Sequence, residues 1–535
     1  MEKSILRIED LVLSLNQKEF ILLDKIVNIL SMSKGDIKFN IVKKSIDSRD
    51  KKKILFVYSV DVFIKDKNIF SRINKKHISK HKIRFIEPYN YDILSVNSDL
   101  VKNRPIVIGS GPSWLFSALI LAKAWLSPIL IERWKDIDSR IEDVNKFFIK
   151  WKLDINSNIQ FGEWWAWMFS DGKLYTWIND SRSNYVFEEL VAAWAPKEIS
   201  YVSKAHIGAD KLIWVVKKLR NKIISLWWEI RFNSCLTDIE IKKNKITSIT
   251  LNWVEKIPTD DIILAIWHSA RDTYQMLYDK GMEIQQKTFA IWLRIEHSKK
   301  LVNQSQFGEE YANPNLPTAS YRLVSHHKDN RSVYTFCMCP GWYVIAASSE
   351  EWRLAVNGMS KYAQNSELSN SALLVSIDPN DFWSDHPLAW IEFQRKWEEA
   401  AFIAWWSNYN APVQLVWDFL ANKPSTKIWT FWPTYKPWYT LTSLDNCLPK
   451  YVSSAIREAI PLLDKKLKWF ATSEAVLTGI ESRSSSPVRL VRDENYQSNI
   501  IWIYPAWEWS WYAWGITSSS IDWLKVAEKI ILKYI

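Results

Sequence analysis

The segment "PIVIGSGPSWLFSALILAKAWLSPILIERW", residues 105–134, constrains the fold of this chain more than any other. It has the pattern of an apolar strand, a glycine-bearing turn, a helix and a second apolar strand. Two parallel strands joined through a crossover helix form a βαβ unit, whose helix packs on one face of a sheet. The segment therefore predicts an α/β domain built on a parallel sheet.

The turn of this unit matches most of a dinucleotide-binding fingerprint, G-x-G-x-x-G. The first glycine makes the tight bend, the second admits a pyrophosphate, and the third lets the helix approach the strand. Glu132 ends the second strand 23 residues after Gly109, where a carboxylate would bind ribose hydroxyls. A helix start near Ser113 would direct its free amides at the diphosphate. An α/β unit that binds no nucleotide is the alternative.

The fingerprint assigns a first set of candidate cofactor-binding residues. Those expected on the diphosphate are Gly109, Ser110, Gly111, Pro112, Ser113 and Trp114. Those expected near the adenosine are Glu132 and Arg133. Trp114 stands where the third glycine belongs, and an indole there would block the packing of the helix on the strand.

Trp114 is one case of a wider imbalance. The chain of 535 residues has 12 glycines and 33 tryptophans. At the usual glycine frequency of about 7%, a chain of this length holds roughly 37 glycines. The glycine deficit is close to the tryptophan excess, which indicates that one residue stands in place of the other.

The positions of the tryptophans favour the same interpretation. Trp125 and the pair Trp227 and Trp228 follow predicted helices, where a left-handed residue, usually glycine, ends the helix. Trp438 follows a proline at the turn position that needs positive φ. We therefore hypothesise that the organism reads UGA as glycine and that the printed sequence translates UGA as tryptophan. Trp397, inside a helical pattern, is the best candidate for a genuine tryptophan.

The alternative to recoding is a Trp-rich protein that binds sugars or a membrane interface through exposed aromatic side chains. Such aromatics should gather on an exposed face and not at helix ends. The positions above therefore favour the recoding hypothesis.

The remaining composition is that of a cytoplasmic globular protein. The chain is 47% hydrophobic and 24% charged, and its length predicts two or three domains. No run of eighteen apolar residues predicts a membrane span, and the N-terminus does not resemble a signal peptide. The four cysteines form no disulfide framework, which indicates a reducing compartment.

Residues 1–98 contain no tryptophan and form a separate unit. Their pattern predicts a strand, a helix over about 17–31, two strands joined by "DSRDKK", a helix near 68–76 and the strand "KIRFIE". This β-α-β-β-α-β order predicts a small ferredoxin-like domain. The unit is rich in lysine, in a chain of net charge +11, so nucleic-acid binding is an alternative to an ordinary solvated lysine face.

Three further segments become glycine-rich when tryptophan is read as glycine, and they favour a flavin cofactor. Residues 256–274 become a strand followed by "AIGHSARDTY", with Trp267 at the glycine position. Residues 503–530 become "IYPAGEGSGYAGGITSSSIDGLKVAEKI", which resembles the late flavin-binding motif of flavoproteins. The resemblance implies that Glu508 binds the ribityl hydroxyls and that a helix start faces the isoalloxazine. Residues 158–176 become "NIQFGEGGAGMFSDGKLYT".

Together with "AHIGADKL" (205–212), "FCMCPGW" (336–342), "PSTKIWTF" (424–431) and "TGIESRSSSPVRL" (478–490), these segments resemble one family closely. It is the family of bacterial FAD-dependent dehydrogenases of unknown substrate, related to the glutathione-reductase-type flavoproteins. The resemblance covers nearly the whole chain and departs from the family at the tryptophans. It implies a ferredoxin-like domain over 1–98, a three-layer, Rossmann-like FAD-binding domain from 99–240 and 455–535, and a substrate domain with returning FAD-domain strands over 241–454.

The resemblance also implies roles for residues outside the fingerprint. The loop from Gly162 to Lys173, with Asp171 and Gly172, is expected to cover the diphosphate or the flavin. The residues expected around the ribityl chain and the ring are Glu508, Tyr512, Gly515 and Ile516, with Trp267 at the returning glycine.

The flavin would supply the hydride chemistry, so the protein need add only one acid or base. His206, His297 and Lys173 are the candidates, although each also fits a hydrogen-bonded structural role. Cys337 and Cys339 have the wrong spacing for a C-x-x-C redox pair and are too few for zinc. We therefore expect structural thiols and no metal site.

No second complete dinucleotide fingerprint is present, even after tryptophan is read as glycine. NAD(P)H is therefore expected only as a transient electron donor. Arg483 and Arg489 are interpreted either as ligands of an anionic substrate or phosphate, or as members of surface ion pairs. The sequence predicts a cytoplasmic FAD-dependent oxidoreductase, a dehydrogenase with an unknown small-molecule substrate. An FAD-dependent enzyme that modifies RNA through its basic N-terminal unit is the alternative.

Overall fold

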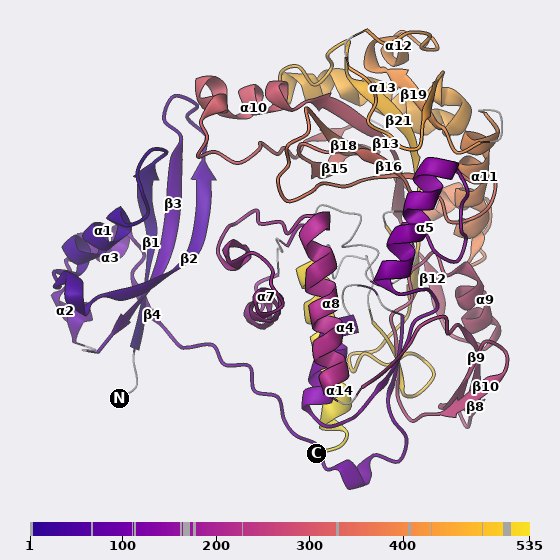
Figure 1. Ribbon diagram of the computed structural model, residues 1–535, viewed down its shortest axis with the longest axis horizontal. Helices are drawn as coiled ribbons and strands as arrows, with labels where there is room; N and C mark the ends of the chain where they lie inside the picture. Colours follow the sequence, from indigo (N-terminus) through magenta and orange to yellow (C-terminus); the bar gives the residue numbers. More distant parts are fainter. Residues whose placement is uncertain are drawn as a thin grey trace.

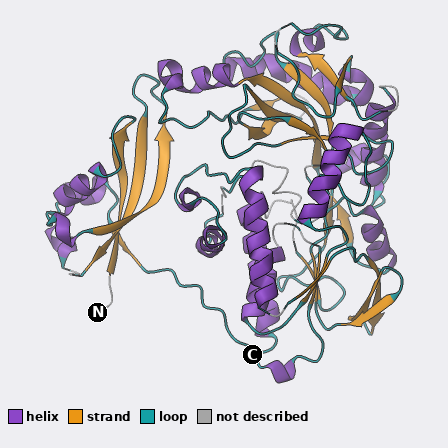
Figure 2. Ribbon diagram, viewed as in Figure 1, coloured by secondary structure: helices purple, strands orange, loops and turns teal. Residues whose placement is uncertain are grey.

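The chain is built around three larger sheets of four, five and seven strands (Figure 1, Figure 2). The computed structural model describes residues 4–65, 68–109, 111, 114–160, 163, 172–174, 178–226, 228–327, 331–404, 408–429, 431–483, 485–506 and 515–535, with the backbone alone at Ser98 and Trp114. Within these ranges, no helix is long and apolar enough to cross a membrane.

The N-terminal unit is an antiparallel sheet with short helices on one face, and its elements follow the order that the sequence predicts. The strand order is β2-β3-β1-β4, and each neighbouring pair is antiparallel. Leu6 and Ile8 of the sheet and Leu22 and Ile26 of the first helix are fully buried in a common core. The elements are β1 (Ser4–Ser14), α1 (Ile21–Leu30), β2 (Lys38–Asp47), β3 (Leu55–Ile64), α2 (Ile69–Arg72), α3 (Lys75–Lys80) and β4 (Arg84–Ile86).

The edge strand β2 ties this unit to the rest of the chain. The backbone amide of Lys44 donates to the carbonyl of Tyr201 at 2.7 Å, and the amide of Ser203 donates to the carbonyl of Lys44 at 2.9 Å. The ammonium group of Lys51, in the loop after β2, donates to the carbonyl of Ser305 at 2.6 Å. Two segments far away in the sequence therefore hold the N-terminal sheet in place.

The five-stranded sheet is entirely parallel and has the order β23-β11-β5-β6-β7. Its first strands in the sequence, β5 and β6, flank the helix α4, so the predicted βαβ unit is confirmed. The chain then adds β7 beyond β6, and it later adds β11 and β23 on the other side of β5. The strand order therefore reverses between the neighbouring strands β5 and β11. In open parallel sheets, ligands bind at this point, outside the carboxyl ends of the strands. The strands are β5 (Ile106–Ile108), β6 (Ile129–Ile131), β7 (Glu229–Arg231), β11 (Ile262–Leu264) and β23 (Ile503–Pro505).

Alternating side chains of these strands belong to two different cores. Val107, Leu130 and Ile263 pack with the helices on one face. Ile106 and Ile129 share the core of the opposite face, which includes residues of the three-stranded sheet β10-β9-β8 (Figure 1). This is the period of two expected for strands buried on both faces. The helices are α4 (Trp114–Lys123), α5 (Ile137–Lys150), α7 (Arg182–Ala192), α8 (Ala209–Ser225) and α14 (Ile516–Leu532), and the strands are β8 (Leu236–Lys242), β9 (Lys245–Leu251) and β10 (Glu255–Pro258).

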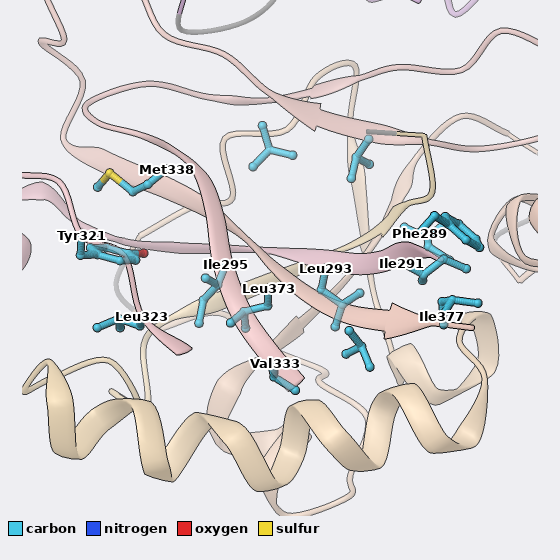
Figure 3. Packing of buried hydrophobic residues seen from close by; sticks show 14 of the residues in the cluster. Phe289, Ile291, Leu293, Ile295, Tyr321, Leu323, Val333, Met338, Leu373 and Ile377 are labelled. Carbon is cyan, nitrogen blue, oxygen red and sulfur yellow. The ribbon is translucent and has the colours of Figure 1, made fainter. Parts of the chain in front are cut away.

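The seven-stranded sheet has the order β14-β15-β18-β13-β21-β19-β20. Figure 3 shows Val333, Leu293 and Leu373 between its strands and a long helix, and all three are fully buried. The strands are β13 (Phe289–Ser298), β14 (Val324–His326), β15 (Ser332–Cys339), β18 (Leu368–Ile377), β19 (Ala411–Leu415), β20 (Tyr439–Leu441) and β21 (Val476–Glu481). The helices of this part are α9 (Arg271–Asp279), α10 (Lys299–Phe307), α11 (Ala389–Ile403), α12 (Val416–Leu420) and α13 (Lys450–Lys466), and two small pairs are β12 (Ile284–Gln286) with β22 (Val488–Leu490) and β16 (Val344–Ala346) with β17 (Val356–Gly358).

One expected boundary differs from the structure. The sequence assigns everything after residue 455 to the FAD-binding part, but 455 lies inside α13, and β21 pairs with β13 and β19 of the seven-stranded sheet. An apolar strand pattern does not specify its partner, so the sequence could not show on which sheet β21 lies. The chain returns to the parallel sheet only at β23.

Many tryptophans occupy backbone positions that suit glycine. Twenty non-glycine residues have positive φ among those described, and eight of them are tryptophan: Trp125, Trp151, Trp194, Trp253, Trp352, Trp383, Trp469 and Trp502. A bulky L-residue rarely adopts this conformation. The expected left-handed conformation of residue 125 after a helix is confirmed, with φ of 71°.

The expectation for two other tryptophans is wrong. Trp438 does not have positive φ, because its carbonyl accepts from the amide of Ala411 at 3.0 Å as β20 begins, and this fixes an extended backbone. Trp228 likewise lacks positive φ and leads directly into β7. Trp227, its neighbour, lies outside the described residues.

Candidate functional site

The glycine turn after β5 is enforced by the strand beside it. Gly109 has φ of +99°, and a Cβ built on it would lie 2.5 Å from the carbonyl oxygen of Ala265, just beyond β11. Both the conformation and the close approach therefore exclude a side chain at this position. Among the residues that the structure describes, none lies within 4 Å of a Cβ built on Gly111, so they leave the space beside the second glycine open.

The residues after β6 lie at the same end of the sheet. Glu132 is 3% exposed, and its Oε1 accepts from the backbone amide of Trp134 at 2.9 Å. Arg133 donates to Asp272 Oδ1 at 2.6 Å, and its guanidinium lies 4.5 Å from the centroid of the Trp134 ring. The acid predicted for the ribose is therefore held in a fixed turn at the carboxyl end of its strand.

A single pocket brings these residues together. Gly109, Gly111, Glu132, Arg133 and Trp267 all line it. It lies at the carboxyl ends of β5, β6 and β11, where the strand order of the parallel sheet reverses. The five residues come from three separated segments that the sequence assigned to the cofactor, so their convergence is a property of the fold.

Two indoles restrict this pocket. Trp134 and Trp267 both line it, and its volume is about 60 Å³. Pockets that hold small-molecule ligands have volumes of roughly 300–1,000 Å³. The glycine turn and the buried acid fit the adenosine half of a dinucleotide, whereas the indoles occupy the space that it would need.

Arg140 supports the wall of this pocket, and the sequence did not reveal this role. It is fully buried in α5, and its guanidinium donates to the carbonyls of Asn158, Ile159 and Glu163 at 2.7 to 2.8 Å. Asn158 and Ile159 directly precede the loop predicted to cover the cofactor, Glu163 belongs to it, and Gln160 beside them lines the pocket. An arginine five residues into an amphipathic pattern gives no sign that it clamps a loop elsewhere.

Glu163 closes the same loop from the other side. Its Oε2 accepts from the amide of Ile137, the first residue of α5, at 3.1 Å and from Arg220 at 2.7 Å. A carboxylate at a helix N-terminus is stabilised by the free amides and the helix dipole. Burial nevertheless raises the pKa of Glu163 to about 7.

A second cluster forms around Lys173 and His206. The two residues are paired by a backbone bridge, and the Lys173 ammonium donates to the carbonyl of Met338. His206 stacks on Tyr362, and its Nε2 lies 3.2 Å from the Tyr362 carbonyl. Next to Lys173, Gly172 has φ of +63° and could carry no Cβ without meeting Leu212 at 2.7 Å.

The start of α14 meets this cluster. The hydroxyl of Thr517 donates to the carbonyl of Leu174 at 2.6 Å. Gly515 precedes the helix, its amide donates to the Ser518 hydroxyl at 3.0 Å, and Ile516 is the first helical residue. Two of the segments predicted to surround the flavin are thus joined directly.

The remaining predicted cofactor residues lie outside the described residues and stay predictions. They are Ser110, Pro112, Ser113, Gly162, Asp171, Glu508 and Tyr512. The backbone of Trp114 begins α4.

His297 does not join either cluster. It lies in β13, its Nε2 is 2.8 Å from the carbonyl of Phe470, and its ring packs against Phe470 and Tyr321. Burial lowers the pKa of His297 to about 4, so the ring is neutral at physiological pH. These contacts indicate a core histidine, the second of the two roles that the sequence allowed.

The two arginines also differ in role. Arg483 is buried, and its Nε donates to Glu398 Oε1 at 2.7 Å. Its expected place in a surface ion pair is therefore wrong, because the guanidinium and its partner Glu398 in α11 are both buried, and its role at an anionic substrate stays a prediction. Arg489 is half-buried and donates to Gln285 at 2.5 Å.

Glu296 predicts a pH dependence of stability. Its carboxyl is buried and accepts hydrogen bonds from Thr434, and burial raises its pKa to about 7. The folded state therefore holds a proton that the unfolded state releases near the ordinary pKa, so this stabilisation is complete below about pH 4.5 and is lost as the pH rises through about 7. Between low and high pH, the parent should lose about 3 kcal/mol of its free energy of unfolding through this group, and Glu296→Gln should abolish that loss.

The measurement is the free energy of unfolding by denaturant at about pH 5 and about pH 8. Glu283→Gln, at an exposed position, is the control and should leave the difference between the two pH values unchanged. A Glu296→Gln protein with the same pH dependence as the parent would contradict the assignment. Glu163 titrates in the same window and remains in both variants.

Comparisons with known proteins support an FAD-dependent family. Residues 288–484 match the family described as FAD-dependent protein, C-terminal domain-like, and residues 5–63 match a domain of unknown function (DUF8436). An uncharacterized protein of Clostridium beijerinckii is 46% identical over 533 residues, which is 99% of each chain.

Solved structures superpose only loosely. The flavin-dependent brominase Bmp2 has a TM-score of 0.37 at 10% identity, over 81% of this chain and 79% of that one. The halogenase PltM has a TM-score of 0.38 at 9% identity, over 81% and 70%.

Proposed function

We propose that this chain is an FAD-dependent oxidoreductase of the dehydrogenase type. It belongs to the same family as the Clostridium beijerinckii protein, which is a family of FAD-dependent proteins. It would transfer a hydride between bound flavin and a small-molecule substrate. The observation that carries the proposal is the convergence of Gly109, Gly111 and Glu132 on one pocket where the strand order of the parallel sheet reverses. A nicotinamide donor would bind only transiently.

The residues of the pocket fit the dinucleotide in their chemistry. Gly109, which has no side chain, lets the turn after β5 lie close to the backbone of Ala265. Gly111 borders open space among the described residues, where the diphosphate would lie, and the buried Glu132 carboxylate is suited to binding ribose hydroxyls. Residues 1–98 would form a ferredoxin-like domain, and the parallel sheet with its helices and the three-stranded sheet would form the three-layer FAD-binding domain. We place the chain in the cytoplasm, as its sequence predicts.

FAD, when bound, would carry the two electrons and the proton of the hydride. His206 is the residue that we propose to hold the proton. Its Nε2 faces the Tyr362 carbonyl, which favours the tautomer with hydrogen on Nε2 and leaves Nδ1 to accept. Lys173 would orient the substrate or the cofactor loop, since its ammonium is held at the carbonyl of Met338.

We further propose that the native protein has glycine at most tryptophan positions, including 114, 125, 134, 227, 228, 267 and 507. The left-handed backbone at eight tryptophans supports this. Glycine at 134 and 267 would also open the pocket.

The test of the flavin function is the cofactor content of the native chain. We expect one FAD per chain after denaturation and separation of the released cofactor, and bleaching of the flavin absorbance under anaerobic reduction. Native protein that carries no flavin and takes up none when FAD is added would overturn the proposal.

An RNA-modifying flavoprotein is a second candidate because positive charge is concentrated at the N-terminus. Residues 1–98 have 20 lysines and arginines against 12 acidic residues. Several of these cations are already paired, as Arg7 is with Asp61 and Lys82 with Asp10. RNA retention by the full chain that weakens steeply with salt would favour this candidate, and no retention at low salt would exclude it.

A further inference from the structure

Cys337 and Cys339 lie at an irregularity of β15. Phe336 pairs with Ala372 of β18, but Cys339 pairs with Asn370, so β15 has one residue more than its partner over this step. This is a β-bulge, a feature that re-aims side chains and often lies beside active sites. Cys337 has φ of 43°, a left-handed conformation that is uncommon for a non-glycine residue.

The bulge brings the two thiols together. In a regular strand, residues two apart are about 6.8 Å from each other, the upper limit of the Cα separation that a disulfide spans. At the bulge, Cys339 Sγ lies 3.2 Å from the carbonyl oxygen of Cys337. The neighbouring Cys337 and burial raise the pKa of Cys339 well above its ordinary range.

Two cations lie against the pair. Arg294 Nη2 is 3.1 Å from the carbonyl of Cys337 and 3.6 Å from Cys339 Sγ. The Lys173 ammonium is bound to the carbonyl of Met338, between the two cysteines. Both positive charges favour the thiolate on Cys339 and oppose the effect of burial.

The two cysteines also differ in access. Cys337 is half-buried, whereas Cys339 is fully buried. A half-buried cysteine two residues before a fully buried one fits an attacking and a resolving cysteine, and Arg294 and Lys173 make the surroundings of the pair electropositive.

We propose that Cys337 and Cys339 form a redox-active dithiol that reduces small-molecule disulfides. The Cys337 thiolate attacks one sulfur of the disulfide, forms a mixed disulfide and releases one thiolate. Cys339 then loses its proton, attacks the sulfur of Cys337 and releases the second thiolate. The result is one protein disulfide and two free thiols, so that two electrons pass from the protein to the disulfide and no other oxidant is needed.

This dithiol is independent of the proposed flavin function. Its exchange chemistry needs only the two cysteines and the disulfide. Lys173, however, belongs to the segment expected to cover the cofactor, and its contact with Met338 connects the dithiol to that segment. The sequence favoured a structural role for Cys337 and Cys339, and this proposal gives them a redox role instead.

The test uses the native full-length chain, reduced and freed of reductant without oxygen, with glutathione disulfide as the probe. After acid quenching, alkylation and trypsin digestion, one peptide, residues 332–353, contains both cysteines. We expect this peptide to lose two hydrogens and to take no alkyl group, with two glutathione molecules released per chain. If both cysteines are alkylated after the incubation, the proposal is overturned.

Variants separate attack from resolution. Cys339→Ser is expected to stop at a mixed disulfide of glutathione with Cys337, whereas the control Cys447→Ser should react as the parent does. A stable mixed disulfide on Cys337 of the parent chain would also overturn the proposal. The parent result does not depend on whether a variant folds. FAD content is measured in the same samples. A chain that binds flavin but has inert cysteines would refute the dithiol alone. A chain that binds no flavin but has an active dithiol would refute the flavin function alone.

Discussion

Gly109→Ala is expected to abolish FAD retention and to lower stability. The new Cβ would lie 2.5 Å from the carbonyl oxygen of Ala265, so the end of β11 must move away from β5. The left-handed conformation costs about 1–2 kcal/mol for a residue with a Cβ, and the overlap adds about 1–3 kcal/mol. The same displacement would open the turn on which the diphosphate depends. The measurements are the FAD released per chain and the free energy of unfolding.

Gly281→Ala is the matched control for this prediction. Gly281 has φ of +81°, but nothing lies within 4 Å of a Cβ built there. It should therefore show the backbone cost of about 1–2 kcal/mol and keep its FAD. If Gly109→Ala keeps full FAD, or if both variants lose it equally, the pocket is not the cofactor site.

A chain with glycine in place of the recoded tryptophans is expected to bind FAD, and the chain as printed is expected to bind little or none. The reason is the pocket, where Trp134 and Trp267 restrict the volume to about 60 Å³. Peptides of the native protein should correspondingly show glycine at residues 125 and 134, with UGA at these codons. Native peptides with tryptophan there, or full FAD in the printed chain, would refute recoding.

Single substitutions sharpen this comparison. Trp125→Gly should raise the free energy of unfolding by about 1 kcal/mol, because residue 125 is exposed and left-handed. Trp397→Gly, inside α11, should lower it by about 1 kcal/mol or more, because glycine is a poor helix former and the indole packs against the core. Opposite signs at the two sites are the expected result, and equal losses at both would contradict the assignment of residue 125.

Local sequence patterns were sufficient to predict features that depend only on residues close together in the sequence. The βαβ unit follows from apolar periodicity around Gly109 and Gly111, and the left-handed site at residue 125 follows from the end of a helix. The same reasoning is wrong for Trp438, where a hydrogen bond to Ala411 keeps the backbone extended. A turn signal read from two residues is thus overruled by a partner strand.

The role of several residues depends on contacts that no local pattern contains. Arg140 binds carbonyls about twenty residues later, and Arg483 pairs with Glu398 in another helix. Lys173 meets Met338 across 165 residues of sequence. Charged and polar side chains of this kind read as ordinary surface residues until the fold excludes water from them.

By itself, the sequence determined the parallel βαβ core, the glycine turn with its acid and the anomalous tryptophans, because each depends on backbone geometry within a few residues. Only the tertiary structure decided that Glu132 and Trp267 share one pocket with that turn, that Lys173 joins His206, and that Cys337 meets Cys339 at a bulge. These arrangements follow from strand order and register, which are set by the burial of whole faces and not by any short segment.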